Sequence, residues 1–569
     1  MQLLSLLKEL SLHPKNAKEL KGLVLQLAVQ GKLTDKWRAD NSTVEPASVL
    51  LEKIEEEKAL LISQKKIKKE KIVETLSKDD APFVLPENWE WCKLIEISSI
   101  NGGFAFKSSN YVDEGARVIR ISDFDELGFK NHKVVRHNYT DDLLPYVLED
   151  RNILIAMTGG TVGKSLFVNH VNETMVVNQR VATIKIIQPI FEAYVNCVIP
   201  TKLIQDVIEE AKNSTNDNIS MSDIKGFNIP IPPLEEQKVI VEVVNALFKE
   251  VEALENLTKD LISLKEDFVT SALRRLTETD NTKQEWNYLQ QHFSSFFTEK
   301  KNIKSLRETI LQLAVQGKLT AQWRADNPNT EPASELLKRI EAEKQQLIAE
   351  KKIKAEKMIT PFEDKEIPFN LPSTWTWCRM QDVCPNITSG STPPKPFFKE
   401  EGIPYLKVYN IRNQKIDFSY KEQFIDNDYH STKLKRSILK PGDVIMNIVG
   451  PPLGKVAIIP DNYKEWNCNQ AISLFRPLDR ALSTWLYTFL CSGSFLQHIE
   501  LIGTAGQDNI SVTKSKTIML PLPPIKEQQA IVEKVNSLMS LCDELDQQVD
   551  NSQSQIEQLM QSCLKEVFE

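Results

Sequence analysis

The most constraining feature of this amino-acid sequence is an internal repeat. Residues 25–41 read LQLAVQGKLTDKWRADN and residues 311–327 read LQLAVQGKLTAQWRADN, so the copies differ only where Asp35 and Lys36 stand in the first. The same offset of 286 residues relates LPENWEWC, which begins at Leu85, to LPSTWTWC, which begins at Leu371. Self-similarity of this length indicates a tandem duplication. The chain must therefore fold as two related halves.

A second matched pair closes each half. IPIPPLEEQKVIVEVVN begins at Ile229 and LPLPPIKEQQAIVEKVN begins at Leu520, an offset of 291 residues. Between these anchors the halves keep landmarks such as Gly163-Lys164 and Gly454-Lys455 but differ at most other positions. Short runs such as ARVIRI, NILIAM and VATIKII alternate with Gly, Asn and Asp clusters, which is typical of strands and turns. We expect each variable block to be a mixed α/β domain on a shared frame.

A different pattern follows each double proline. Apolar side chains recur at a 4,3 spacing, which indicates a long helix with a coiled-coil seam. Proline suits the first turn of a helix, and the glutamates that follow favour the positive end of the helix dipole. The alternative is a core face inside a globular bundle. The seam residues are Ile240, Val244, Leu247, Val251, Leu254 and Leu261 in the first half, and Ile531, Val535, Leu538, Leu545, Val549, Ile556 and Leu559 in the second.

These patterns predict a mixed α/β fold in which long antiparallel coiled-coil helices separate two α+β domains related by a pseudo-twofold axis. A helix of forty residues rises about 60 Å, so such helices would hold the two domains well apart. The expected order is a helical region at 1–79, a first variable domain at 80–232, a long helix at 233–276, a linker at 277–302, a second helical region at 303–367, a second variable domain at 368–523 and a C-terminal long helix at 524–569.

Composition limits the classes of protein to consider. The chain has 569 residues and a net charge of −8, which argues against a protein that coats nucleic acid along its whole length. No apolar run reaches the roughly 18 residues of a membrane span, and Lys8 and Glu9 interrupt the apolar start. The eight cysteines form no CxxC pair, so we expect reduced thiols and a cytoplasmic protein.

Three features together carry a family resemblance. The helical regions with AVQGKLT, the two variable blocks and the PxPPxxEQ openings resemble the specificity subunits of type I restriction-modification enzymes over nearly the whole chain. GGFAFKSSNY from Gly102 and SGSTPP from Ser389 look like the usual openings of that family's target-recognition domains. Residues 151–164 and 442–455, each an apolar strand followed by a glycine turn, look like its central motif.

The resemblance implies a subunit that reads DNA without doing chemistry. Each target-recognition domain would read one half of a bipartite double-stranded DNA target. The helical regions would bind two adenine-N6 methyltransferase subunits and two motor-endonuclease subunits, which carry out methylation and restriction. Neither a cofactor nor a catalytic residue is implied for this chain.

The residues agree with a chain that lacks catalytic machinery. There is no NPPY-type sequence and no Gly-rich cofactor fingerprint, and the seven histidines form no HxH or HExxH group. The stretch from Gly159 to Ser165 resembles a phosphate loop, but Gly159 and Gly163 enclose three residues where that loop needs four. A strand-edge turn explains it better. The alternatives are a nucleotide-binding enzyme and a coiled-coil scaffold whose two domains bind other proteins.

Charge and side-chain type suggest where DNA would bind. Between Pro82 and Pro232 there are 14 basic and 19 acidic residues, whereas between Pro368 and Pro523 there are 17 basic and 13 acidic residues. The charge balance therefore favours DNA binding more clearly for the second domain than for the first. Cations suit phosphates, while Arg, Lys, Asn and Gln suit base edges. The candidates are Lys107, Arg120, Lys164, Gln179 and Arg180 in the first domain, and Lys395, Lys407, Asn410, Arg412, Lys455 and Gln470 in the second.

Two further features are expected to be structural. Trp89 and Trp91 recur as Trp375 and Trp377, and specificity residues should differ between the halves, so we interpret these tryptophans as packing residues. Residues 277–302 have no matched copy in the right place and begin polar, which is why we treat them as a linker, although their phenylalanines could pack.

Overall fold

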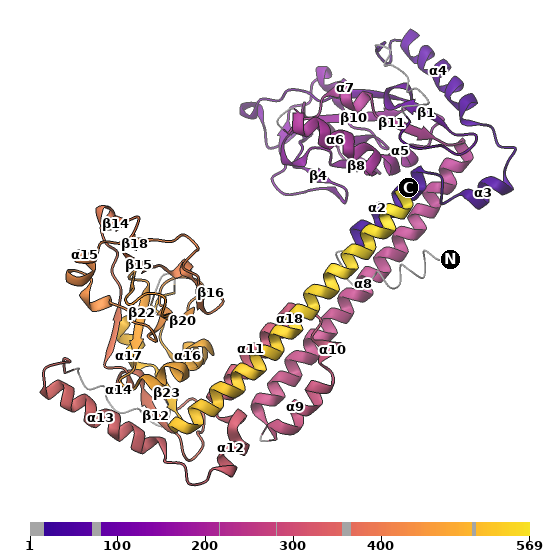
Figure 1. Ribbon diagram of the computed structural model, residues 1–569. Coiled ribbons are helices and arrows are strands. Elements are labelled where there is room, and N and C mark those ends of the chain that lie inside the picture. The colour runs from indigo at the N-terminus through magenta and orange to yellow at the C-terminus, as the bar shows by residue number, and fades with distance from the viewer. Residues whose placement is uncertain are drawn as a thin grey trace. The chain divides into compact units, whose positions relative to one another are not determined.

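The structure is a computed structural model that describes residues 16–70, 81–214, 217–279, 281–355, 366–502 and 508–568. The chain divides into two compact units. One runs to Ile262 and includes the end of the last helix from Ile556, and the other runs from Ser263 to Gln555. Figure 1 shows that each unit combines a domain of strands and short helices with segments of long helix. The mixed α/β class is thus confirmed.

The first domain is built on a four-stranded antiparallel sheet in the order β2-β10-β7-β8. Its apolar strands β7 and β10 are the NILIAM and VATIKII runs, and β7 is buried along its whole length. A smaller sheet, in the order β6-β3-β9, adds a parallel pairing of β3 with β9. The bounds are β2 Ser98–Gly102, β3 Ala116–Ile119, β6 Arg136–His137, β7 Ile153–Ala156, β8 Ser165–Phe167, β9 Met175–Val177 and β10 Val181–Ile186.

The second domain repeats this arrangement. Its antiparallel sheet has the order β13-β22-β19-β20, and β15 pairs in parallel with β21. Each pairing corresponds to one in the first domain, so the duplication extends through the blocks whose sequences have diverged. The bounds are β13 Asn386–Ser389, β15 Ile403–Leu406, β19 Val444–Asn447, β20 Val456–Ile458, β21 Asn467–Cys468 and β22 Ile472–Arg476.

A separate two-stranded ribbon brings the ends of each domain together. In the first domain β1, Glu90–Lys93, pairs antiparallel with β11, Asn228–Ile231, and in the second β12, Thr376–Arg379, pairs with β23, Met519–Leu522. Each ribbon joins the LPxxWxWC motif to the strand before the double proline, so the chain leaves each domain next to the point where it enters.

Two long helices begin directly after the double prolines, as predicted. Helix α8 spans Leu234–Glu278 and helix α18 spans Ile525–Phe568. Each is antiparallel to a shorter helix of the repeated region: α8 to α2, Asn16–Val29, and α18 to α11, Lys300–Val315. Equivalent ion pairs mark the two contacts, at 2.7 Å between Lys21 and Glu252 and 2.6 Å between Arg307 and Asp543.

The seam residues have different fates in the two long helices. In α18 all five of Ile531, Val535, Leu538, Leu545 and Val549 are buried, Ile556 is half-buried, and the side chain of Leu559 lies outside the described residues. In α8 Ile240, Val244 and Val251 are buried, while Leu247 and Leu254 are half-buried.

Leu261 departs from the expected seam, since 45% of it is exposed. The buried positions shift by one residue over this part of α8, to Val269, Leu273 and Leu276. A straight helix has 3.6 residues per turn rather than 3.5, so a seam drifts round the helix unless supercoiling corrects it. Over several turns α8 follows this drift instead of a strict heptad.

The segment expected as a linker is helical and packed. It forms α9, Thr282–Gln291, and α10, Phe293–Phe296. Phe293 and Phe297 are buried in the same cluster as Val269, and Phe296 stacks on Phe268 of α8 with ring centroids 4.0 Å apart. The segment begins with polar residues, so its sequence does not reveal the apolar side chains that pack against α8 in the folded chain.

Among the described residues, no helix is both long and apolar enough to cross a membrane.

Candidate nucleic-acid interface

In each domain, loops gather at one end of the main sheet. The register places Gly102 opposite Ala182, Val181 opposite Ala156 and Ile155 opposite Ser165. The carboxyl ends of β2 and β7 therefore meet the amino ends of β10 and β8 at one edge. The second sheet has the same register, with Ile472 opposite Asn447. We call this edge, with its connecting loops, the loop end of the domain.

The loop end of the first domain collects the predicted contact residues. Lys164 precedes β8, and Gln179 and Arg180 form the turn before β10; all three are exposed. Arg120 follows β3, which reaches the same end because the Asn178 amide donates to the Ile119 carbonyl at 2.9 Å. Lys107 is exposed just after the GGFAF segment, which is hydrogen-bonded to β9 through Phe104.

The second domain places its candidates in matching positions. Lys455 precedes β20, the exposed Gln470 lies in the turn before β22, and Lys407 follows β15. The Asn469 amide donates to the Leu406 carbonyl at 3.0 Å, which repeats the contact in the first domain. The remaining exposed candidates, Lys395 and Arg412, lie in the helical turn Lys395–Phe397 and in strand β16, Ile411–Arg412.

The two openings of the variable domains share one glycine requirement. A Cβ on Gly103 would lie 2.2 Å from the Val177 carbonyl oxygen, and a Cβ on Gly390 would lie 2.0 Å from the Cys468 carbonyl oxygen. Only glycine lets the chain after β2 or β13 pass so close to the neighbouring backbone. GGF and SGS therefore dock the opening loop onto the loop end.

The turn that resembles a phosphate loop belongs to a β-hairpin. Residues Gly159–Thr161 form a 3-10 turn between β7 and β8, and no long helix follows. Gly159 and Gly163 have φ values of +71° and +82°, and the Ala156 amide donates to the Lys164 carbonyl at 2.9 Å. The strand-edge reading is confirmed, and Lys164 projects from this turn as an exposed cation.

The side chains of two predicted contact residues form hydrogen bonds within their own domains. The Arg120 guanidinium binds both carboxylate oxygens of Asp123, at 2.8 and 2.9 Å, and this hydrogen bonding raises the pKa of Arg120. Asn410 is 1% exposed. Its side chain accepts from the Lys407 amide at 2.9 Å and donates to the carbonyls of Asp417 and Tyr420. Asn410 therefore positions a loop rather than facing solvent, and Arg120 is held against the domain.

Aromatic side chains that the sequence reading did not select lie among the cations of the second domain. The Arg412 guanidinium carbon lies 4.3 Å from the Tyr420 ring centroid. The Lys421 ammonium lies 5.4 Å from Tyr420 and 5.7 Å from Tyr409, and Lys407 lies 6.0 Å from Tyr409. Such contacts hold cations over ring faces. The interleaving of Lys, Arg and Tyr from 407 to 421 was the signal that could have found them.

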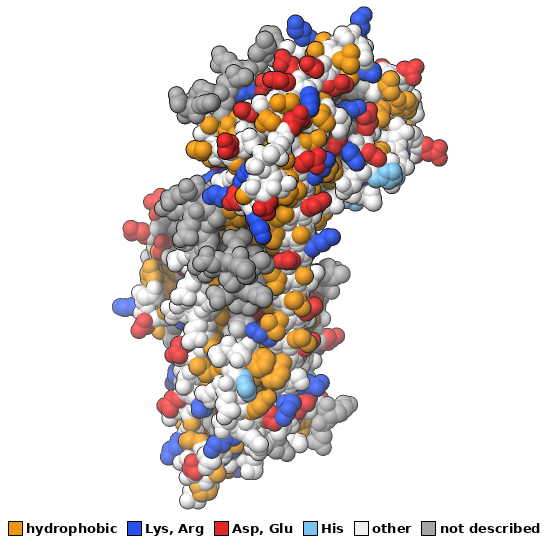
Figure 2. Space-filling view, turned by 90° about the vertical axis from the view of Figure 1, so that its right-hand side faces the viewer, with side chains coloured by type: hydrophobic (Ala, Val, Ile, Leu, Met, Phe, Trp, Pro, Cys, Tyr) orange, Lys and Arg blue, Asp and Glu red, His pale blue; other side chains and the backbone are white. Residues whose placement is uncertain are grey.

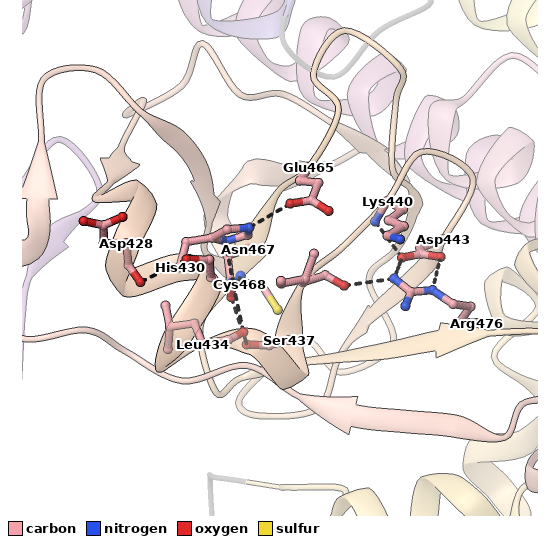
Figure 3. Close-up of polar contacts among 12 residues, drawn as sticks. Asp428, His430, Leu434, Ser437, Lys440, Asp443, Glu465, Asn467, Cys468 and Arg476 are labelled. Atoms are coloured by element: carbon pink, nitrogen blue, oxygen red, sulfur yellow. Dashed lines mark hydrogen bonds and ion pairs between the residues drawn. The ribbon is translucent and has the colours of Figure 1, made fainter. Parts of the chain in front are cut away.

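A buried polar network lies at the other end of the second domain's main sheet, opposite its loop end (Figure 3). Asp443, fully buried before β19, accepts from Arg476 at 2.9 Å, from Arg480 at 2.6 Å and from the Lys440 amide at 2.7 Å. This carboxylate ties the chain just before β19 to the end of β22 and to the residues that follow β22.

A second network surrounds the buried His430 (Figure 3). The Asn467 amide donates to His430 Nδ1 at 3.1 Å, so the proton on Nε2 faces Glu465, 3.2 Å away. Within the described part of the chain, no cluster of three or more His, Cys, Asp or Glu could hold a metal ion.

A buried glutamate anchors each half. Glu236 accepts from Thr34 at 2.7 Å and from the Trp89 indole at 2.9 Å, and it also pairs with Arg38. Glu236 comes from the EEQ segment, Thr34 and Arg38 from the long repeat, and Trp89 from the LPxxWxWC motif. The three repeated motifs therefore meet at one carboxylate.

The second half repeats the anchor residue for residue. Glu527 accepts from Thr320 at 2.7 Å, from Trp375 at 2.9 Å and from Arg324 at 2.5 Å. The packing role expected for Trp89 and Trp375 is confirmed. From the sequence, these glutamates were expected only to interact with the helix dipole in the first turn. Glu236 and Glu527 occupy matched positions in the two halves, and this match is the signal from which the anchor could have been predicted.

Charges of both signs are mixed on the face of the molecule that Figure 2 shows. On the face drawn in Figure 2, acidic and basic side chains alternate among the described residues rather than forming one basic field. This agrees with the net charge of −8. Any DNA contact must then come from local groups such as those at the loop ends.

Comparison with known proteins gives consistent matches. A family model described as the type I restriction modification DNA specificity domain matches residues 86–263 and 372–555. The type I restriction enzyme EcoAI specificity subunit of Escherichia coli is 29% identical over 93% of this chain and 90% of its own length. The EcoEI specificity subunit of the same species is 29% identical over 94% of this chain and 91% of its own length.

The fold also matches a solved structure. A chain from work on complex assembly and conformational transition of the type I R-M system aligns with a TM-score of 0.50 at 17% identity, covering 86% of this chain and 99% of that one. The two matched copies of the specificity domain coincide with the two strand domains and with the starts of α8 and α18. The chain therefore belongs to the family of type I restriction-modification specificity subunits, with two copies of the DNA specificity domain.

Proposed function

We propose that this chain is the non-catalytic subunit that selects the DNA target of a type I restriction-modification complex. Each strand domain recognises one half of a bipartite sequence. The observation that carries the proposal is the pair of loop ends, which share strand order and register but present different side chains. A common frame with different exposed chemistry is what two readers of different half-sites require.

The proposed function also implies which molecules this chain binds. Double-stranded DNA is bound at the loop ends, and the helical segments hold two adenine-N6 methyltransferase subunits and two motor-endonuclease subunits in the cytoplasm. Those subunits carry out methylation and restriction, and this chain needs no cofactor. The duplicated α2–α8 and α11–α18 pairs support two equivalent docking places for one kind of partner.

The loop-end candidates with exposed or half-exposed side chains divide into two classes. Lysines suit phosphates, whereas Arg, Asn and Gln side chains suit base edges. We assign Lys107, Lys164, Lys395, Lys407 and Lys455 to phosphates, and Gln179, Arg180, Arg412 and Gln470 to bases. Arg120 and Asn410 position the loops on which these residues lie.

The long helices would set the spacing of the half-sites. Helix α8 has 45 residues, which corresponds to about 68 Å at 1.5 Å per residue. One turn of DNA is roughly 34 to 36 Å. We therefore expect the two half-sites to be separated by a spacer of fixed length that these helices set.

The test is to map methylated adenines in DNA from cells that express this chain with its candidate methyltransferase. A split motif is expected, and exchanging residues 90–231 for the corresponding domain of a relative should change only one half of it. If a competent complex forms and no split motif appears, the proposal is wrong. The protein-binding scaffold alternative predicts little effect of salt on the binding of its ligand, whereas phosphate binding weakens steeply as salt rises.

A further inference from the structure

A short hairpin follows the parallel core strand in both domains. In the first domain it consists of β4, Phe124–Asp125, and β5, Gly128–Phe129, and in the second of β16 and β17, Lys415–Ile416. We call these the reading hairpins. One backbone contact closes both: the Lys130 amide donates to the Asp123 carbonyl at 2.8 Å, and the Asp417 amide donates to the Asn410 carbonyl at 2.8 Å.

The two reading hairpins have one scaffold with inverted charges. Asp125 pairs with Lys130 at 2.9 Å in the first, and at the equivalent positions Arg412 pairs with Asp417 at 3.5 Å in the second. The hydrogen bond from Lys130 holds the pKa of Asp125 below its usual value. The backbone contact is retained although residues 123–130 and 410–417 differ at every aligned position, and the charges of the ion pair are reversed, as expected of an element that discriminates between targets.

Both reading hairpins lie against the strand that follows the glycine turn of the loop end. In the second domain the Gln414 side chain accepts from the Val456 amide at 2.6 Å, next to Lys455, and the Tyr487 hydroxyl donates to the Gln414 carbonyl at 2.9 Å. In the first domain β4 packs beside β8, and Lys164 is close enough to contribute to lowering the pKa of Asp125. Each tip is therefore held beside an exposed or half-exposed lysine suited to a phosphate.

The tips present different side chains. In the first hairpin Leu127 is 93% exposed, although its amide is fixed by a 3.0 Å hydrogen bond to Asp125 Oδ1. In the second, Arg412 is stacked on Tyr420 and is flanked by the exposed Asn413 and Lys415. The exposed Leu127 side chain stands on a backbone fixed by a hydrogen bond, and the Arg412 guanidinium is oriented by the Tyr420 ring. Both side chains are therefore available to contact a binding partner.

We propose that the reading hairpin determines base preference in each domain, with Leu127 contacting a thymine methyl group and Arg412 donating to a guanine edge. This inference rests on the proposed function. Apolar side chains contact the thymine C5-methyl, and arginine donates two hydrogen bonds to guanine O6 and N7. Stacking on Tyr420 reduces the conformational freedom that Arg412 loses on binding. The inverted pairs then explain how one frame reads two different half-sites.

The experiment uses the chain in complex with its methyltransferase and a randomised duplex DNA library, sequenced before and after selection. Leu127→Ala should lower the preference for thymine at one position of one half-site by about fourfold, the factor expected for losing a methyl-sized apolar contact. Arg412→Lys should lower the preference for guanine at one position of the other half by roughly tenfold or more, because lysine keeps the charge but not the paired donors.

Matched controls separate base reading from folding and from charge. Leu144→Ala removes another exposed leucine of the first domain, and Arg436→Lys changes another exposed arginine of the second; both should leave the motif unchanged. Arg412→Lys should also keep the wild-type salt dependence, since the number of phosphate-facing charges is the same.

The outcomes distinguish this inference from the proposed function. If the wild-type complex selects a split motif but the Leu127 and Arg412 variants select the same motif with unchanged base preferences, the hairpin assignment is overturned and the proposed function stands. If the wild-type complex selects no split motif, the proposed function itself fails. Variants that lose binding to all sequences equally would also overturn the assignment, because they would show a general affinity role.

Discussion

At the scale of residues, the strongest constraint is the buried carboxylate of each half. Glu236 and Glu527 are fully buried, and the carboxylate of each accepts hydrogen bonds from a hydroxyl, an indole N–H and a guanidinium. A buried charge is tolerated only when it is paired and hydrogen-bonded, and removal of one partner leaves the others uncompensated. The repeated motifs are thus linked by one electrostatic requirement rather than by three separate ones.

Glu527→Ala should destabilise the second unit by about 3 to 5 kcal/mol, because it strands Arg324 beside the buried indole of Trp375. Urea unfolding followed by tryptophan fluorescence measures the change. The exposed Glu533→Ala, on the same helix, should change the free energy of unfolding by less than about 0.5 kcal/mol. Equal effects of the two substitutions would contradict the anchor role.

Buried thiols make stability depend on alkaline pH. Burial raises the pKa of Cys197 and of Cys468 to about 12, well above the value of 9.0 for an unperturbed thiol. The unfolded chain therefore loses these protons first, so the stabilising contribution is complete below pH 9 and is lost as pH rises toward 12. Urea midpoints should fall over this interval. Iodoacetamide at pH 8 should label these two cysteines in the unfolded chain and spare them in the folded chain, as mass spectrometry would show.

At the scale of elements, the sequence predicted more than its local propensities alone would allow. The double prolines located the starts of α8 and α18, and the apolar runs located the central strands. The drift of the α8 seam and the folding back of α9 were not predictable. Both depend on which helix packs alongside, and periodicity within one segment does not carry that information.

A matched pair of substitutions tests the seam. Leu545→Asp places a charge at a position that is 6% exposed, whereas Leu261→Asp changes a position that is 45% exposed. The first should cost at least about 3 kcal/mol, since it buries an unpaired charge, and the second less than about 1 kcal/mol. Thermal unfolding monitored by circular dichroism at 222 nm compares them. A larger loss of stability for Leu261→Asp than for Leu545→Asp would show that α8 keeps the strict heptad and would contradict the drift of its seam.

At the scale of the whole molecule, the repeat predicted two domains of one fold, and the structure adds their loop ends. Lys164, Gln179 and Lys455 are predicted from landmarks that the two halves share, and the structure places all three at the loop ends because shared landmarks mark the frame. Tyr420 and Leu127 could not be selected in this way, since the halves differ at these positions and leave no repeat. Asn410 was selected by side-chain type, although burial gives it a positioning role.

Lys455→Ala should weaken DNA binding about equally for all sequences and reduce the slope of log affinity against log salt by about one, as expected for loss of a single phosphate contact. Fluorescence anisotropy of the methyltransferase complex at several salt concentrations measures both quantities. Lys464→Ala, an exposed lysine of the same domain, is the control and should leave the slope unchanged. A change in base preference instead would assign Lys455 to base reading.

The ribbons β1–β11 and β12–β23 have a consequence for how such a chain can change over generations. Because each domain begins and ends on neighbouring strands, it is an insertion that closes on itself. A gene segment for one domain is then a transferable cassette. The tryptophan that meets the buried glutamate stands one residue before the first of these strands and stays with the recipient chain, so the loops of an incoming cassette can be entirely foreign. Recombination between repeats could thus create a new target specificity in one step, while the long helices stay as they were.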